Sequence, residues 1–247
     1  MTQPAAVVTD DNPLTAATVA AASSYVESEA WAVRLERWAA GYAEQINAAI
    51  LQAIGRGAGP LAVAAQVRQY AENVPVSAAA TLTRTLQLTS YRDASVEMEN
   101  INGGLIEYKI RIAAMDDRTC LSCIALHGTR LEVGERVDDH YNGRCTEFYV
   151  VQGGDRQPAF MQSDSQPGER NFVPYQSGEE WFAGLPPARQ GQQAAMQNSP
   201  ALLAAYNSGM PLSAFVGERH DDVFGRQVVQ QSLIGALGEE RAKEFYK

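Results

Sequence analysis

The chain has 247 residues, which is enough for one large domain or two small ones. Its 20 basic and 29 acidic residues give a formal charge of −9 at pH 7, which argues against a broad basic face for gripping duplex DNA. The three cysteines all fall between Cys120 and Cys145, and an odd number in so short a window argues against a secreted disulfide scaffold. We therefore expect the cysteines to form a local site in a protein made in a reducing compartment.

The first 24 residues are rich in Ala, Thr and Asp and contain few large apolar side chains. Segments of this composition bury too little apolar surface to fold alone, so we predict an arm over residues 1–24 that is loose or ordered by a partner. The N-terminus has no basic n-region, and no run of about 18 apolar residues occurs in the chain. We expect no targeting signal, no membrane span and a soluble, intracellular protein.

Three helices are predicted over residues 25–102. Apolar side chains recur at steps of four and three from Trp31 onward, which places them on one face of a long helix. A glycine-rich stretch ends this helix, and Pro60 suits the first turn of the next one. The third helix begins near Ser77 and ends at Asn102, which two glycines follow. These residues therefore form a helical subdomain.

The period of the apolar residues changes from 3.6 to 2 after residue 103. From Ile106 to Ile112 apolar residues alternate with charged ones, which is typical of a β-strand. A second strand is predicted within Thr146–Gln152. Residues 103–152 thus form a small antiparallel β unit, too small to be stable without the helices or a metal.

Residues 153–176 are rich in Gly, Pro, Gln and Ser and are typical of a linker or extended strap. Residues 177–247 contain several short helical patterns, beginning with a helix capped by Ser177. A last helix is predicted over Asp222–Leu237. The predicted fold class is α+β, with a helical N-terminal subdomain, a small β unit and an irregular, partly helical C-terminal extension.

Four residues of the cysteine window have the composition of a zinc site. Cys120 and Cys123 form a Cys-x-x-Cys pair, which lets two sulfur atoms converge on one ion. His140 and Cys145 supply the second pair, and Cys3His is a normal structural zinc set. Four ligands leave no open position for water, so such a site is structural and not catalytic. The alternative is three reduced, buried thiols with no metal, and the sequence leaves both open.

Other chemistries fit this window less well. A thioredoxin-like pair needs a βαβ context, and a metalloprotease needs His-Glu-x-x-His. A zinc deaminase needs His-x-Glu, whereas His127 is followed by Gly and Thr. We interpret His127 as a loop histidine. No acid, base and nucleophile set converges in the sequence, so we expect no catalytic residues and no small-molecule substrate.

Two acidic residues, Asp116 and Asp117, precede the first cysteine. Carboxylates at such a position accept hydrogen bonds from the backbone N–H groups of a turn. Arg84 on the third predicted helix has two interpretations. Its side chain either pairs with one of these carboxylates or is exposed to solvent.

The window resembles the Mu-F-like head-morphogenesis proteins of tailed phages, also called minor head or minor capsid proteins. Their pattern runs Asp-x-Arg-x-Cys-x-x-Cys, then Leu-x-Gly, then His-Pro-Asn-Cys-Arg-Cys. In this chain it falls on Asp116, Arg118, Cys120, Cys123, Leu126, Gly128, His140, Asn142, Arg144 and Cys145. Tyr141 stands in place of the proline and Gly143 in place of the first cysteine of the last triplet. The resemblance is strongest over residues 60–150 and weaker over 177–235.

The resemblance implies a structural, non-enzymatic protein of the virion head, present in the host cytoplasm during assembly. It implies portal protein and major capsid protein as partners in head assembly and in DNA packaging or delivery. Packaged DNA is an additional candidate partner, and a membrane is not expected. The alternative is a zinc-knuckle adaptor that binds protein or nucleic acid. A third reading is an enzyme on this scaffold, such as a toxin-like transferase.

Overall fold

The computed structural model describes residues 13–39, 41–70, 75–154, 160–161, 172–173, 175–193 and 199–246. The chain divides into two compact units. In the described residues, the first unit consists of 13–102 with the short segments 140–143 and 220–227, and the second consists of 103–139, 144–219 and 228–246. Residues 1–12 and most of the predicted linker lie outside the described residues.

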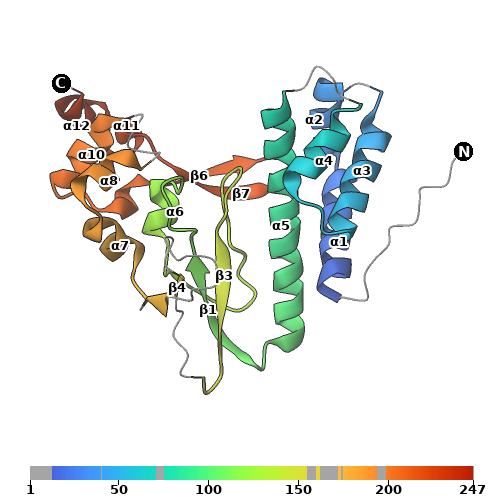
Figure 1. The fold of residues 1–247 in the computed structure, drawn as a ribbon, viewed down its shortest axis with the longest axis horizontal. Helices are drawn as coiled ribbons and strands as arrows, with labels where there is room; N and C mark the ends of the chain where they lie inside the picture. Colours follow the sequence, from blue (N-terminus) through green and yellow to red (C-terminus); the bar gives the residue numbers. More distant parts are fainter. Residues whose placement is uncertain are drawn as a thin grey trace, which may run out of the picture. The chain divides into compact units, whose positions relative to one another are not determined.

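The first unit is a bundle of helices that includes one long helix, α5 (Figure 1). Its helices are α1 (Pro13–Val26), α2 (Glu29–Ala39), α3 (Ala43–Gly55), α4 (Pro60–Val67) and α5 (Val76–Asn102). Helices α1 and α4 pack against α5, and α3 packs against α1 and α4. The core contains the periodic apolar residues of the sequence, including Trp31, Leu35, Ile46, Ile50 and Leu86.

Two predictions for this unit need correction. Residues 13–24, predicted as part of a loose arm, lie in α1. Their alanines have high helix propensity, and small side chains such as Ala22 can pack closely against neighbouring helices without large apolar groups. The single long helix predicted from Trp31 is two helices, because Gly41 has a φ of +82° and this left-handed conformation ends α2.

The second unit contains a three-stranded antiparallel sheet in the order β2-β1-β3. The strands are β1 (Ile106–Ile112), β2 (Arg130–Leu131) and β3 (Thr146–Val151), so both strands predicted from alternation are confirmed. A short helix, α6 (Leu121–Ala125), lies between β1 and β2 in the chain. The predicted linker region contains two short paired strands, β4 (Phe160–Met161) and β5 (Phe172–Val173).

The C-terminal residues supply the rest of the second unit. Its short helices are α7 (Gly178–Gly184), α8 (Pro187–Gln192), α10 (Pro200–Asn207), α11 (Leu233–Leu237) and α12 (Glu239–Ala242), with 3-10 turns η1 (Leu212–Phe215) and η2 (Lys243–Phe245). Ser177 caps α7 as predicted, in a reciprocal arrangement with Glu180. Leu121 and Ile124 of α6 share one core with Phe182, Phe215 and Leu233, so this region is packed onto the cysteine helix.

The helix predicted over Asp222–Leu237 is wrong in its first half. Strands β6 (Val216–Asp221) and β7 (Gly225–Gln230) form a two-stranded sheet here. The Asp221 carboxylate accepts hydrogen bonds from the N–H groups of Val223 and Phe224, both at 2.9 Å, and fixes the turn between the strands. Gly225 leaves this turn with a φ of +74°. Among the described residues, no helix is long and apolar enough to cross a membrane.

Candidate metal centre

The three cysteines lie at the ends of two elements of the second unit. Cys120 is the residue before α6, Cys123 lies within that helix, and Cys145 directly precedes β3. Cys123 and Cys145 are buried, whereas Cys120 is half-buried, and none of them forms a disulfide. Ala113, Leu131 and Val137 pack around the two buried thiols. The thiols therefore occupy a small apolar cluster beside the sheet.

The described part of the chain brings two overlapping groups of ligand atoms together. The ligand atoms of Cys120, Cys123 and His140 lie within 4.8 Å of one another, and so do those of Cys123, Asp139 and Cys145. Cys123 belongs to both groups. The structure thus adds Asp139 to the four residues that the sequence predicted. This Cys/His cluster could hold a metal ion.

The donor atoms fit zinc in kind and in spacing. Zinc takes thiolate sulfur, imidazole nitrogen and carboxylate oxygen, and bonds of about 2.3 Å in a tetrahedron place sulfur ligands about 3.8 Å apart. Because each group already lies within 4.8 Å, a contraction of about 1 Å or less would suffice. A bound ion would therefore require only small side-chain movements.

Asp139 is the residue of this cluster that sequence reasoning missed. Its side chain is fully buried, and its Oδ2 accepts a hydrogen bond from the N–H of Cys145 at 3.1 Å. Its Oδ1 lies 3.5 Å from the Cys123 Sγ, which donates to it. A buried carboxylate must be paired, hydrogen-bonded or bound to a metal. The only signal in the sequence is its position directly before His140.

Arg111 of β1 supplies a buried positive charge to the same place. Its Nη2 lies 3.5 Å from the Asp139 carboxylate, and its Nη1 donates a hydrogen bond of 2.6 Å to the carbonyl of Asp138. Burial alone would lower the pKa of Arg111, but Cys145, Asp139 and Cys123 hold that pKa above its ordinary value. A divalent ion on two thiolates and one carboxylate would carry one net negative charge, which this guanidinium would balance.

Two of the three charged residues of β1, Lys109 and Arg111, are buried, whereas Glu107 is exposed. Lys109 is fully buried, and its Nζ lies 2.9 Å from the carboxylate of Glu147 on β3. The alternation of apolar and charged residues correctly predicts the strand. It does not predict that Lys109 and Arg111 are buried. Both charges are buried because each has an acidic partner.

The two buried thiols differ in how readily they lose a proton. Hydrogen bonds with Cys120 and Cys145, together with burial, raise the pKa of Cys123. The hydrogen bond from Cys123 lowers the pKa of Cys145, and Arg111 adds to this effect. Cys145 is therefore the first of this pair to become a thiolate, which is the form that binds metal.

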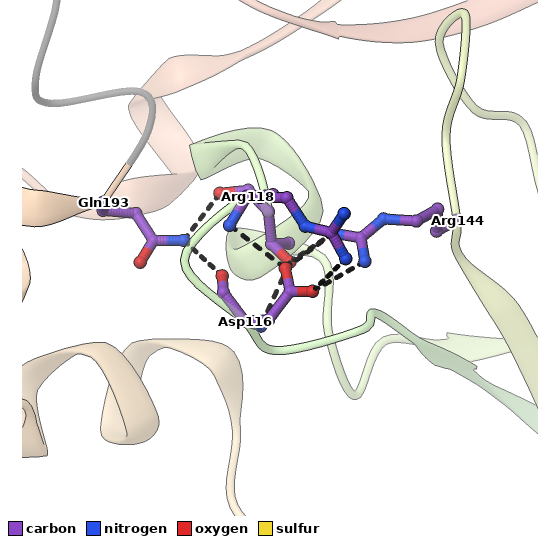
Figure 2. A network of polar contacts seen from close by, with 5 residues as sticks. Asp116, Arg118, Arg144 and Gln193 are labelled. Atoms are coloured by element: carbon purple, nitrogen blue, oxygen red, sulfur yellow. Dashed lines mark hydrogen bonds and ion pairs between the residues drawn. The ribbon is translucent and has the colours of Figure 1, made fainter. Parts of the chain in front are cut away.

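Asp116 and Arg144 close the cysteine window with a bidentate ion pair (Figure 2). Arg144 Nη1 and Nη2 donate to the two carboxylate oxygens at 2.7 and 2.6 Å. As predicted, Asp116 also accepts a backbone hydrogen bond, from the N–H of Arg118 at 3.1 Å. These contacts, with that from Arg144 the strongest, hold the pKa of Asp116 well below its usual range. Gln193 donates to the carbonyls of Asp116 and Thr119 at 2.6 and 2.9 Å.

Neither of the two interpretations of Arg84 describes its contact, since Arg84 is half-buried and its guanidinium donates to the Asn142 side chain at 3.3 Å. Asn142 is held on α5 by two further bonds, in which its N–H and its Nδ2 donate to the hydroxyls of Thr85 and Thr81 at 3.2 and 2.9 Å. Arg92 donates to the carbonyl of Gly143 at 3.1 Å. Within the first unit, the segment 140–143 is therefore fastened to the long helix.

His127 has the structural role that the sequence suggested. Its Nδ1 accepts a hydrogen bond from the N–H of Ala113 at 3.0 Å, and burial lowers its pKa to about 4. The neutral ring stacks on Tyr175, with centroids 6.0 Å apart. The following glycine, Gly128, has a φ of +90°, and a Cβ there would overlap the Tyr175 hydroxyl. This explains why Leu-x-Gly in this loop requires glycine.

A known protein family matches the part of the chain that contains the motif. The model of the family described as phage Mu protein F like matches residues 44–148. These residues belong to the phage Mu F-like family. The Mu F-like segment runs from α3 into β3 and includes every predicted ligand, so the resemblance is confirmed over this part of the chain. It indicates a phage head-morphogenesis protein. No curated protein and no solved structure matches the chain significantly.

Proposed function

We propose that this protein is a non-enzymatic minor head protein that acts with portal protein and major capsid protein during head assembly and DNA packaging or delivery. The match of the Mu F-like family to residues 44–148 carries this proposal. On this proposal the protein belongs to the virion head and, during assembly, is present in the host cytoplasm. Packaged DNA is an additional candidate partner.

The contacts of the motif residues support a structural role. Asp116 and Arg144 bind each other, Asn142 binds α5, and Gly128 accommodates Tyr175. Catalytic groups need a shared position where a reacting atom can sit, with a nucleophile, a base and an oxyanion donor around it. The polar groups of Asp116, Arg144 and Asn142 instead form hydrogen bonds that hold the loop in place. A scaffold that presents a fixed surface to partners suits this arrangement.

We further propose that a zinc ion stabilises the cysteine window, with Cys120, Cys123, His140 and Cys145 as its ligands. Cys123 is central because it belongs to both groups of converging ligand atoms. Asp139 would orient Cys145 through the backbone hydrogen bond or replace one of the four ligands. A structural zinc ion would contribute its binding free energy to the folding of the loop that joins these residues.

Head assembly provides the direct test. The protein would be coexpressed with the portal and major capsid proteins of the phage that encodes it, and assembled heads would be separated from free subunits. We expect it to copurify with portal and to enter heads. Its failure to do either would overturn the proposal. Binding of DNA alone with a steep dependence on salt would support the adaptor alternative instead.

A further inference from the structure

The helical unit contains a pocket of about 500 Å³ to which the cysteine window contributes one residue, Tyr141. It is lined by Arg34, Arg37, Pro75, Ser77, Ala78, Thr81, Leu82 and Tyr141. Pockets of roughly 300 to 1,000 Å³ are typical of small-molecule sites. The role of this pocket is not explained by the contacts that close the cysteine window.

Arg34 is held in one orientation at this pocket. Its Nη2 lies 3.1 Å from the Asp221 carboxylate, and its Nη1 donates to the Tyr141 hydroxyl at 3.1 Å. The guanidinium also lies over the ring of Phe224, 5.6 Å from its centroid. Tyr141 in turn donates to Asp221. A guanidinium fixed on three sides loses little further freedom when it binds a ligand.

Arg37, one helical turn further along α2, supplies the second charge. It is exposed, and the described residues include no ion-pair or hydrogen-bond partner for it. Asp221 balances the charge of Arg34, so Arg37 leaves the pocket with one excess positive charge. The described residues that line the pocket include no carboxylate, although the chain has 29 acidic residues and a net charge of −9. The pocket is therefore a local cationic site on an acidic protein.

Two hydroxyl groups of α5 face the same pocket. Thr81 Oγ1 accepts a hydrogen bond from Asn142 Nδ2 at 2.9 Å, which leaves its own proton available for a ligand. Ser77 is exposed, and its hydroxyl bonds to no group in the described part of the chain. Two guanidinium groups and two hydroxyls together offer more donors than the two oxygen atoms of a carboxylate can accept. The oxygen atoms of a phosphate suit them better.

The remaining wall of the pocket is apolar. Pro75, Ala78 and Leu82 contribute only carbon atoms to it from the start of α5. An inorganic phosphate ion is far smaller than the pocket and would leave this wall in contact with water. A ligand that fills the pocket needs a carbon body attached to its anionic group.

We propose that this pocket binds an organic phosphate. The phosphate group lies among Arg34, Arg37 and the two hydroxyls, and the organic body lies against Pro75 and Leu82. This chemistry has two sources, a free nucleotide and the terminal phosphate of a nucleic acid strand. Both carry a phosphomonoester on a sugar and a flat base whose face can pack against apolar side chains.

Calorimetric titration of the full chain with four probes would test this assignment. The probes are inorganic phosphate, thymidine 5′-monophosphate, a 5′-phosphorylated tetranucleotide and the same tetranucleotide without the terminal phosphate. We expect the nucleotide to bind at least about tenfold more tightly than inorganic phosphate, since only the nucleotide can use the apolar wall. Binding of the phosphorylated tetranucleotide, without binding of its unphosphorylated form, would identify a strand end as the source.

Arg37→Gln is the informative variant because Arg37 is exposed and has no hydrogen-bond or ion-pair partner among the described residues. Loss of one charge-assisted hydrogen-bonding group should weaken nucleotide binding about tenfold or more. Arg68→Gln is the matched control, since Arg68 is an exposed arginine at the end of α4 outside the pocket. It should bind the nucleotide as the unchanged protein does. Equal thermal melting curves would establish that both variants are folded.

Three results would overturn the assignment. The first is the absence of binding by any phosphorylated probe at millimolar concentration. The second is equal weakening in Arg37→Gln and Arg68→Gln, which would indicate attraction by overall charge. The third is binding of inorganic phosphate as tightly as the nucleotide, which would show that the apolar wall contributes nothing to the affinity.

Discussion

Asp116 and Arg144 lie 28 residues apart in the chain, and their bidentate ion pair joins the two ends of the cysteine window. Asp116 precedes the turn that leads into Cys120, and Arg144 directly precedes Cys145. The pair therefore fixes the distance between the segments that carry these two thiols. Gln193 binds the same turn from the C-terminal region, so three separate stretches of chain meet at Asp116 (Figure 2).

Replacement of Asp116 by Asn should weaken this junction. We expect the free energy of unfolding to fall by about 1 to 2 kcal/mol, a value reduced because both side chains keep contact with solvent. Asp117→Asn is the matched control, since Asp117 is exposed beside it and should change stability by less than about 0.5 kcal/mol. Urea denaturation measures both. Similar losses in the two variants would argue against a specific role for the pair.

Zinc content should depend on Cys123 more than on any other residue of the cluster. We expect about one zinc ion per chain in freshly purified protein and almost none in Cys123→Ser, because both groups of ligand atoms contain this thiol. Mass spectrometry of the metal would measure this. His220→Gln, a change at an exposed histidine outside the cluster, should keep the metal.

Cys120→Ser and Asp139→Asn then identify the fourth ligand. If a substitution abolishes zinc binding, the replaced side chain is a ligand. If zinc stays bound, the replaced side chain only lies near the ion. Removal of zinc by a chelator should also lower the melting temperature by several degrees, since zinc binds the folded state preferentially. Zinc well below one per chain in the unchanged protein would contradict the whole proposal.

His127 should make stability depend on pH. Because burial lowers its pKa to about 4, the unfolded state binds a proton near pH 6.5 while the folded state does not. His127 therefore does not lower the free energy of unfolding above about pH 6.5. As the pH falls from 6.5 toward 4, protonation of the unfolded state lowers that free energy progressively. Nuclear magnetic resonance titration of the His127 ring would measure the folded-state pKa directly. A value near 6.5 would refute the buried, neutral ring.

Substitution of Gly128 by Ala should destabilise the loop that carries His127. The residue has a φ of +90°, and an added Cβ would overlap the Tyr175 hydroxyl. Backbone strain alone costs about 1 to 3 kcal/mol, so we expect at least this loss of unfolding free energy. Gly104→Ala is the control, because a Cβ at Gly104 meets nothing within 4 Å and needs no positive φ. Equal melting temperatures in the two variants would show that position 128 does not require glycine.

The elements that depend on local periodicity were predictable from the sequence. The alternation from Ile106 to Ile112 predicted β1, and the four-residue spacing from Trp31 predicted helices that the structure contains. The break at Gly41 was less visible, because one glycine inside an apolar pattern does not by itself end a helix. Helix α1 was missed since its alanines pack without a strong apolar stripe.

The contacts between distant residues could not be read from periodicity. Nothing near Asp116 indicates that Arg144 is its partner, or that Arg84 contacts Asn142 instead. Asp139 also gives no signal of its own, because acidic residues are common in loops and few of them are buried. The spacing of Cys120, Cys123, His140 and Cys145 did predict the cluster to which Asp139 belongs. Whether that cluster holds zinc stays a prediction.

The shared core of α6 and the C-terminal region has a consequence for synthesis on the ribosome. Leu121 and Ile124 are covered by Phe182, Leu212 and Leu233, which are made much later than the cysteines. Until those residues emerge, α6 cannot complete its packing in the nascent chain. The helix that carries Cys123 therefore reaches its final packing only after the last third of the chain has been synthesised.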